Sequence, residues 1–212
     1  CLSGSARFFK PAYSIFLINK WLPSIRGAVK TLTKGGSFAD IGCGFGHSTT
    51  MIAEQFSQSS VRGIDPHEKS IHEAQKIAEQ KNLNNLTYEI ASAENYSGEY
   101  DIISFFDCLH DMGDPVAAVS YAKTKLKSGG ALMIIEPYAN DEVSENFNII
   151  GQMYYSFSTI ACVPASKSQK GGMALGAQAG LKKLTNVLNN GGFSKVEMTY
   201  KTASNMVIEA RV

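Results

Sequence analysis

Three glycines at alternate positions follow an acidic residue at the end of a short apolar run. The acid is Asp40 and the glycines are Gly42, Gly44 and Gly46. Glycine tolerates a positive φ and carries no Cβ, so this backbone can turn sharply and a small ligand can lie against it. The next residues are compatible with a helix, whose first N–H groups and positive dipole end suit a carboxylate or a phosphate. Residues 37–46 therefore predict a strand, a tight turn and a helix start that bind a small molecule, although an ordinary glycine-rich turn has the same pattern.

The spacing of the glycines separates classes of ligand. The dinucleotide fingerprint is G-x-G-x-x-G, but His47 stands where its third glycine would be, and the sequence has no G-x-x-x-x-G-K-[ST] pattern. Loops that cradle phosphates are therefore less favoured. Asp65 ends the second predicted strand, and an acid about 20 residues after such a loop can accept hydrogen bonds from ribose hydroxyls. A cap on the helix that follows is the alternative role for Asp65.

Strand-like and helix-like segments alternate along most of the chain. This alternation argues for a doubly wound, mostly parallel sheet with helices on both faces, and two further runs near the C-terminus predict an antiparallel strand pair. The predicted strands are 37–41, 61–65, 86–90, 100–106, 131–136, 195–200 and 206–211, and the predicted helices are about 46–56, 67–80, 115–126 and 181–189.

Two segments depart from the alternation. Residues 1–34 are predicted to be a helical lead-in that packs near the glycine loop, with a break or a second helix start at Pro23, and residues 35–212 the main domain. Residues 140–180 lack a clear strand and are too long for a plain connection, so we expect one or two helices plus a loop that covers the site. The aromatic stretch 147–157 suits a core or a dimer interface better than a substrate pocket, with a lid as the alternative.

Composition disfavours several classes of function. The 212 residues carry a formal net charge of +1, which gives no general attraction to nucleic acid. No apolar run is long enough to span a bilayer, and residues 1–20 do not resemble a secretory signal. Separated cysteines without a C-x-x-C pattern indicate reduced thiols and a cytoplasmic location. These cysteines are Cys1, Cys43, Cys108 and Cys162, and no His, Cys or Asp cluster has metal-ligand spacing.

The sequence DIGCGFG at 40–46 resembles the first motif of class I S-adenosylmethionine-dependent methyltransferases. The resemblance implies a Rossmann-like α/β fold with a mostly parallel seven-stranded sheet. It also implies S-adenosylmethionine as cofactor and S-adenosylhomocysteine as product, with Asp40 facing the amino group of the cofactor and Asp65 binding its ribose. The cofactor residues implied in this way are Asp40, Gly42, Cys43, Gly44, Gly46, Asp65, Ser92, Ala93, Phe106 and Asp107.

The loop after the third predicted strand departs from that family's pattern. Ser92 stands where the family commonly has an aspartate against the adenine. The backbone around Ala93 or the side chain of Glu94 would then supply this contact. A plain surface loop is an equally good interpretation of these residues.

A second motif, LHDMGD at 109–114, follows the fourth predicted strand. It resembles the L-H-D-x-x-D segment of small-molecule O-methyltransferases, in which the histidine, here His110, is the general base. A phenol with a pKa near 10 is mostly protonated at neutral pH, and an imidazole titrating near 6.5 can take its proton. The family also places a carboxylate after the fifth strand to orient this histidine, and Glu136 matches it. The alternative for His110 is a purely structural histidine. Asp114 is expected to cap the next helix. Asp111 is either a cofactor contact or a turn residue.

These resemblances imply an enzyme that transfers a methyl group from S-adenosylmethionine to a hydroxyl of a small aromatic or quinone-like acceptor. A nitrogen, carbon or protein acceptor stays open, as does a cofactor-sensing regulatory module with little turnover. HDMGDP, ALGAQAG and NMVIEAR further resemble a bacterial subgroup in which a winged-helix-like segment precedes the catalytic domain. That segment is absent from this sequence, which begins at Cys1, so we expect a fragment or a processed form. Expected partners are the acceptor and, as an open option, a second copy in a homodimer, with no nucleic acid and no membrane.

Overall fold

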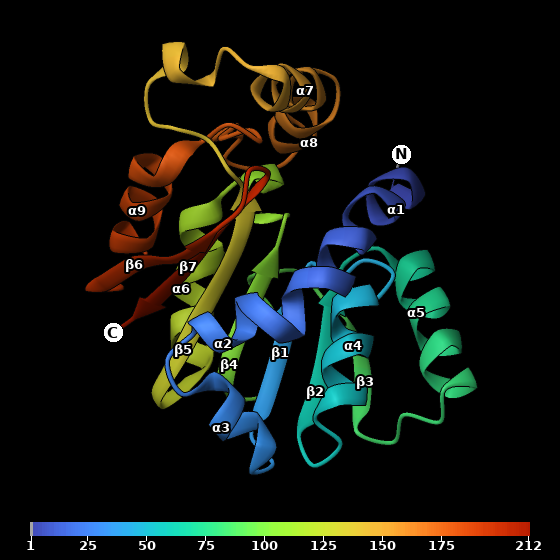
Figure 1. The fold of residues 1–212 in the computed structure, drawn as a ribbon. Coiled ribbons are helices and arrows are strands. Elements are labelled where there is room, and N and C mark those ends of the chain that lie inside the picture. Colours follow the sequence, from blue (N-terminus) through green and yellow to red (C-terminus); the bar gives the residue numbers. More distant parts are fainter. Residues whose placement is uncertain (1) are drawn as a thin grey trace. The chain divides into compact units, whose positions relative to one another are not determined.

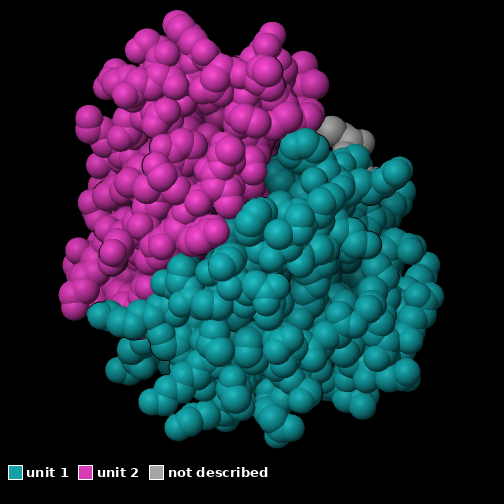
Figure 2. All heavy atoms as spheres, in the orientation of Figure 1, with its two compact units in different colours: residues 1–106, 125–133 teal, residues 107–124, 134–212 magenta. Residues whose placement is uncertain are grey.

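The computed structural model describes residues 2–212 (Figure 1). Two compact units can be distinguished, one of residues up to Phe106 with Lys125–Met133, the other of Asp107–Thr124 with Ile134–Val212 (Figure 2). The strands are β1 (Ser37–Ile41), β2 (Ser60–Asp65), β3 (Leu86–Ile90), β4 (Tyr100–Phe106), β5 (Leu126–Pro137), β6 (Lys195–Lys201) and β7 (Asn205–Arg211). They are hydrogen-bonded in one sheet in the order β3-β2-β1-β4-β5-β7-β6, which confirms the predicted α/β class with seven strands.

In the first unit, β1 lies at the centre of a parallel arrangement. Phe38 of β1 stands opposite Val61 of β2 on one side and Ile102 of β4 on the other, and β2 pairs in turn with β3. Side chains on both faces of β1 are buried, which is typical of a strand covered on both sides. Because paired parallel strands end at the same edge, the glycine loop after β1 lies next to Asp65 at the end of β2.

The first unit begins with a helical segment that contacts the helix after the glycine loop. α1 (Leu2–Ala12), the π-type helix η1 (Tyr13–Trp21) and α2 (Leu22–Ser24) join through helical backbone, and η1 contacts α4 (His47–Gln55) (Figure 1). Pro23 lies in the first turn of the short α2, as the predicted second helix start allows, and the helix ends after Ser24, where Ile25 is extended. Gly27, whose φ is +79°, then precedes α3 (Ala28–Thr33). The lead-in is therefore helical, and its treatment as a region separate from 35–212 stays a prediction.

Other element boundaries mostly follow the sequence, with one exception. α5 (Glu68–Gln80) and α6 (Pro115–Lys125) begin close to their predicted starts, and Asp114 caps α6 by accepting a hydrogen bond from the backbone N–H of Ala117 at 2.9 Å. The strand predicted at 131–136 begins earlier, at Leu126, so the pair Gly129-Gly130 lies inside β5 instead of in a turn before it. Gly129 has a φ of +76° inside this strand, so it supplies a local irregularity of the strand.

The second unit combines a strand pair with helices. β6 and β7 are antiparallel, with Lys195 opposite Arg211, as predicted. A helical run over 149–167 starts at Asn148, whose side chain accepts a hydrogen bond from the N–H of Gly151, and an irregular segment follows it. The helices of this unit besides α6 are η2 (Leu109–Asp111), η3 (Val143–Asn146), α7 (Ile149–Phe157), η4 (Ser158–Cys162), α8 (Val163–Lys167) and α9 (Gly180–Asn190).

The aromatic stretch 147–157 is divided between core and surface. Tyr154 is 2% exposed and packs in a cluster with Cys162 and Ala177. Its hydroxyl donates a hydrogen bond to the carbonyl of Ser204 at 3.0 Å. Phe147, at the start of the stretch, is 80% exposed. The stretch therefore supplies a core to the second unit and also an apolar surface.

Two further expectations concern membranes and cysteines. Within residues 2–212, no helix combines the length and the apolar character that crossing a bilayer requires. Cys43 and Cys162 are buried thiols outside any disulfide, as the spacing of the cysteines predicted. Cys1 lies outside the described residues.

The packing of η1 predicts unequal effects of two truncations. Leu17→Ala should lower the free energy of unfolding by about 2–5 kcal/mol, because it leaves a cavity at a fully buried position. Ile15→Ala removes a side chain that is 60% exposed on the same helix, and should change that free energy by less than about 0.5 kcal/mol. Urea denaturation of both variants measures the difference. Equal effects would show that η1 does not pack as described.

Candidate functional site

Hydrogen bonds to the end of β2 hold the glycine loop in place. The N–H groups of Gly42 and Cys43 both donate to the carbonyl oxygen of Ile64, at 2.8 and 3.1 Å. The N–H of Gly44 donates to Oδ2 of Asp65 at 2.9 Å. The loop belongs to no strand or helix, so these hydrogen bonds to the end of β2 hold its shape.

Two of the glycines are required for different reasons. Gly46 has a φ of +71°, and a Cβ on it would lie 2.2 Å from the hydroxyl oxygen of Tyr88. A side chain at Gly46 would therefore strain the backbone and displace Tyr88. Gly44 also has a positive φ, of +52°, but a Cβ there would meet nothing within 4 Å. The backbone at Gly44 consequently borders open space, which suits a ligand lying against the loop.

The carboxylate of Asp65 links the loop to the start of α5. Its Oδ1 accepts a hydrogen bond from the N–H of His67 at 2.8 Å, while Oδ2 accepts the one from Gly44. The N-cap of α5 is His67, whose Nδ1 accepts a hydrogen bond from the N–H of Ser70 at 3.2 Å. Capping of α5 is therefore not the role of the Asp65 side chain. Since each carboxylate oxygen has two lone pairs, Asp65 retains acceptor capacity for a ligand.

Asp40 lies fully buried beneath the loop. Ser48 donates a hydrogen bond to its Oδ2 at 2.5 Å and Ser104 one to its Oδ1 at 3.3 Å. Burial raises the pKa of Asp40 to about 7, although the two hydroxyls oppose this change. Burial likewise raises the pKa of the Cys43 thiol well above its usual range. Burial therefore disfavours the charged form of Asp40, and Cys43 remains a protonated thiol that packs against the backbone.

The ionisable groups Asp40 and Asp65 beside the loop are both acidic. Among the described residues, neither Asp40 nor Asp65 forms an ion pair with a basic side chain. Two carboxylates without a cationic partner repel a pyrophosphate and attract a cation. The electrostatics thus agree with the glycine spacing in disfavouring a dinucleotide.

The other predicted cofactor residues of the first unit lie in different surroundings. The N–H of Ala91 donates to the carbonyl of Asp65 at 3.3 Å, which ties the end of β3 to the end of β2. Beyond it, Ser92 is exposed and Ala93 is half-buried. Phe106, at the end of β4, is buried and its ring packs on that of Tyr13, with centroids 5.7 Å apart. Ser92 and Ala93 therefore flank the end of β2, whereas the Phe106 ring packs against η1.

In the second unit, Asp107 adopts an uncommon backbone conformation. Its φ is +49°, its N–H donates to the carbonyl of Ile135 at 2.8 Å, and its Oδ1 accepts a hydrogen bond from the side-chain amide of Asn205 at 3.0 Å. Aspartate is one of the few non-glycine residue types that tolerate this left-handed region. The sequence gives no signal for Asn205, because nothing in its spacing connects it to Asp107.

His110 and Glu136, which the family resemblance implied as neighbours, are in contact and buried. The exposed fractions are 2% for His110 and 1% for Glu136. Oε1 of Glu136 accepts a hydrogen bond from the backbone N–H of His110 at 3.2 Å, and Oε2 contacts Nδ1 of the ring. Holding both the backbone and the ring fixes the imidazole and directs Nε2 away from Glu136.

Two further groups lie beside Nε2 of His110. Oδ1 of Asp111 is 3.2 Å from it, and the thiol of Cys162 is also adjacent. Burial by itself would lower the pKa of His110, but the charge of Glu136, together with Asp111 and Cys162, raises it well above the usual range. Burial would raise the pKa of Asp111, and His110 outweighs this effect and lowers it. Sequence reasoning missed Cys162, because it is distant in the chain from His110 and belongs to no motif.

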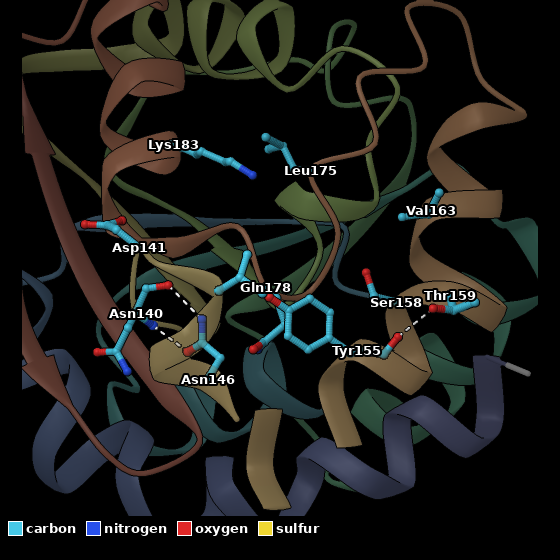
Figure 3. A pocket seen from close by; sticks show the side chains of 11 residues that line it. Asn140, Asp141, Asn146, Tyr155, Ser158, Thr159, Val163, Leu175, Gln178 and Lys183 are labelled. Carbon is cyan, nitrogen blue, oxygen red and sulfur yellow. Dashed lines mark hydrogen bonds between the residues drawn. The ribbon is translucent and has the colours of Figure 1, made fainter. Parts of the chain in front are cut away.

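A separate cavity of about 400 Å³ lies in the second unit (Figure 3). Side chains of Tyr155 and Lys183 line it, and Asn140 and Asn146 at its edge are joined by hydrogen bonds. None of the residues predicted from the sequence as catalytic or cofactor-binding lines this cavity.

Known proteins with a similar sequence or fold are described as methyltransferases. A family model described as a methyltransferase domain matches residues 32–192. Ubiquinone biosynthesis O-methyltransferase of Acinetobacter baylyi is 28% identical over 153 residues, which is 69% of this chain and 60% of that protein. The matched part thus spans about 60% of the length of this curated relative, which is less than two thirds.

Two solved structures have a similar fold. One is an O-methyltransferase family protein from Burkholderia thailandensis, with a TM-score of 0.73 and 15% identity, covering 99% of this chain and 57% of that protein. The other is human N-acetylserotonin methyltransferase in complex with SAM, with a TM-score of 0.69 and 15% identity, covering 100% of this chain and 56% of that protein.

The buried carboxyl of Asp40 predicts a pH dependence of stability. Its pKa of about 7 in the folded protein exceeds the ordinary 3.8, so between these pH values the folded state holds a proton that the unfolded state has lost. Stability should therefore fall as pH rises through this window, by at most about 4 kcal/mol. Asp40→Asn cannot ionise and should lack this loss. Urea denaturation of both proteins at about pH 5 and about pH 8 tests this, and parallel pH dependences would contradict it.

Proposed function

This chain belongs to the methyltransferase domain family, and we propose that it transfers a methyl group from S-adenosylmethionine to a hydroxyl oxygen of a small molecule. The observation that carries the proposal is the glycine loop held by Asp65 and underlain by Asp40, neither of which forms an ion pair with a basic side chain among residues 2–212. The bound SAM of the human structure and the O-methyltransferase names of the other relatives support the choice of cofactor and acceptor atom.

The residues of the loop fit this cofactor. When bound, S-adenosylmethionine supplies an electrophilic methyl group on a positively charged sulfur. The remaining lone pairs of Asp65 are suited to ribose hydroxyls, and the open backbone at Gly44 to the methionine part. Asp40 and Asp65 add negative charge that favours a cation. The full set of proposed cofactor residues is Asp40, Gly42, Cys43, Gly44, Gly46, Asp65, Ser92, Ala93, Phe106 and Asp107.

His110 is the proposed general base. Glu136 holds Nδ1 and the backbone N–H, so Nε2 is the nitrogen that takes the proton of the acceptor hydroxyl. For this the hydroxyl must occupy the place beside Nε2 where the carboxylate of Asp111 now lies. Withdrawal of that carboxylate also removes one of the groups that hold a proton on the ring. The side chain of Asp111 is 41% exposed, so this withdrawal would take the carboxylate toward solvent and not into the core.

The acceptor is proposed to be a small aromatic or quinone-like molecule. The name of the Acinetobacter relative supports this class, and the chain covers only part of that protein's length. A cytoplasmic location, a homodimer and the domain boundary between residues 34 and 35 remain predictions from the sequence.

Replacing Asp65 tests the cofactor site. Asp65→Asn should weaken binding of S-adenosylmethionine about ten- to a hundredfold, because a hydrogen bond to a charged group is worth about 1.5–3 kcal/mol. Glu68→Gln, which removes an exposed carboxylate at the start of α5, should bind as the wild type does. Calorimetric titration with S-adenosylmethionine and S-adenosylhomocysteine measures both affinities. Undiminished binding by Asp65→Asn would remove Asp65 from the site, and absence of binding by the wild type would refute the proposed cofactor.

Replacing His110 tests the base separately from the cofactor. His110→Ala should keep the affinity for S-adenosylmethionine within about twofold and lower the methylation rate by about a hundredfold or more, the usual contribution of a positioned base. His72→Ala, at an exposed position of α5, is the matched control and should be fully active. Rates are measured by mass spectrometry of the products formed from phenolic and quinol acceptors. Normal turnover by His110→Ala would exclude His110 as the base, and methylated nitrogen or carbon would refute the hydroxyl acceptor.

A further inference from the structure

Three side chains with different donor atoms converge in the second unit. Nε2 of His110, a carboxylate oxygen of Asp111 and Sγ of Cys162 all lie within 4.8 Å of one another. The first two residues belong to η2 and the third to η4, so the group is built by the fold and not by local spacing. The proposed base uses only one of these atoms, and the thiol has no part in it.

The donor set is one that zinc prefers. Imidazole nitrogen, thiolate sulfur and carboxylate oxygen are the ligands found in tetrahedral zinc sites. Zn–N and Zn–S bonds of about 2.0 and 2.3 Å place neighbouring ligand atoms about 3.5 Å apart in such a site. Nε2 of His110 and Oδ1 of Asp111 are already 3.2 Å apart. The three donor atoms lie within 4.8 Å of one another, so binding would need Cys162 to approach by at most about 1.3 Å.

The surroundings of the group are also those of a metal site. A histidine that binds a metal usually has its other ring nitrogen held by a carboxylate, and Glu136 holds Nδ1 of His110 in this way. Oδ1 of Asp111 is buried and lies 3.2 Å from Nε2 of His110, without meeting the geometry of a regular hydrogen bond among the described residues. A cation bound between these two atoms would be stabilised by the buried carboxylate oxygen.

One side of the group is accessible. The side chain of Asp111 is 41% exposed, whereas that of His110 is only 3% exposed and Cys162 as a whole 7%. A cation can thus enter past Asp111, and a water molecule can complete the coordination from the same side.

We propose that His110, Asp111 and Cys162 bind a zinc ion through Nε2, a carboxylate oxygen and Sγ, with water as the fourth ligand. The Cys162 thiol loses its proton to the solvent as the Zn–S bond forms. Binding is independent of the proposed methyl transfer. If that function also holds, zinc occupies the nitrogen assigned as the base and inhibits turnover.

Metal binding is tested directly, without an activity assay. Metal-free protein is titrated with Zn²⁺ in competition with a chromophoric chelator, and with Co²⁺ to detect the charge-transfer absorption of a cobalt–thiolate bond. The wild type should bind one ion per chain and show this band. Cys162→Ser should lose the band and at least tenfold in zinc affinity. Cys108→Ser, which removes a thiol near His110 in sequence but outside the group, should behave as the wild type.

A second variant separates a built site from an incidental one. Glu136→Gln leaves the three donor atoms in place but weakens the support of Nδ1, and should lower zinc affinity about 10–100-fold. Circular dichroism establishes that each variant is folded. No zinc binding by the wild type, or equal affinity in the wild type and Cys162→Ser, would overturn the proposal. Zinc binding without inhibition of an active enzyme would refute the base role of His110 and leave the metal site standing.

Discussion

The contact on which the cofactor side of the structure depends is the carboxylate of Asp65 between two backbone N–H groups. One belongs to Gly44 in the loop after β1, the other to His67 at the start of α5. A loop rich in glycine loses much conformational entropy on folding, so it needs fixed partners to keep one shape. Asp65 and the neighbouring carbonyl of Ile64 provide them. The residue proposed to bind the ribose therefore also shapes the surface on which the rest of the ligand lies.

In the same region, ionising the buried carboxyl of Asp40 costs free energy, and a positively charged ligand would lower that cost. Within the described part of the chain, Asp40 is buried with two serine hydroxyls and without a basic partner, and its raised pKa reflects the cost of ionising it there. A positively charged ligand near the loop would lower this cost and favour the ionised form. If the proposed cofactor binds there, stability and ligand binding would be coupled through one carboxyl that has no exposed surface.

A structural feature could be predicted from the sequence when the residues that cause it are close together in the chain. β1, β3 and β4 have their predicted bounds because apolar runs end at glycines, acids and turns that act within a few residues. The predicted start of β5, at residue 131, was wrong because the pair Gly129-Gly130 permits a turn but does not require one. Cys162 and Asn205 were missed because their partners, His110 and Asp107, are brought to them only by tertiary packing. Glu136 was found through a resemblance of motifs, and no local pattern would have paired it with His110.

The buried imidazole of His110 connects the two proposals through a single atom. Glu136 determines the orientation of the ring and leaves Nε2 as the nitrogen with a choice of partner. In the structure that partner is Asp111. An acceptor hydroxyl would have to take the place of Asp111, whereas a metal ion would bind Nε2 and the Asp111 carboxylate together. The hydroxyl and the metal ion need the same lone pair of Nε2, so they exclude one another. A carboxylate that is partly exposed is suited to giving way to the hydroxyl, because moving it into water costs far less than moving a buried charge. The chemistry of the second unit is therefore decided by which group binds Nε2, while the contact of Glu136 with the ring stays the same.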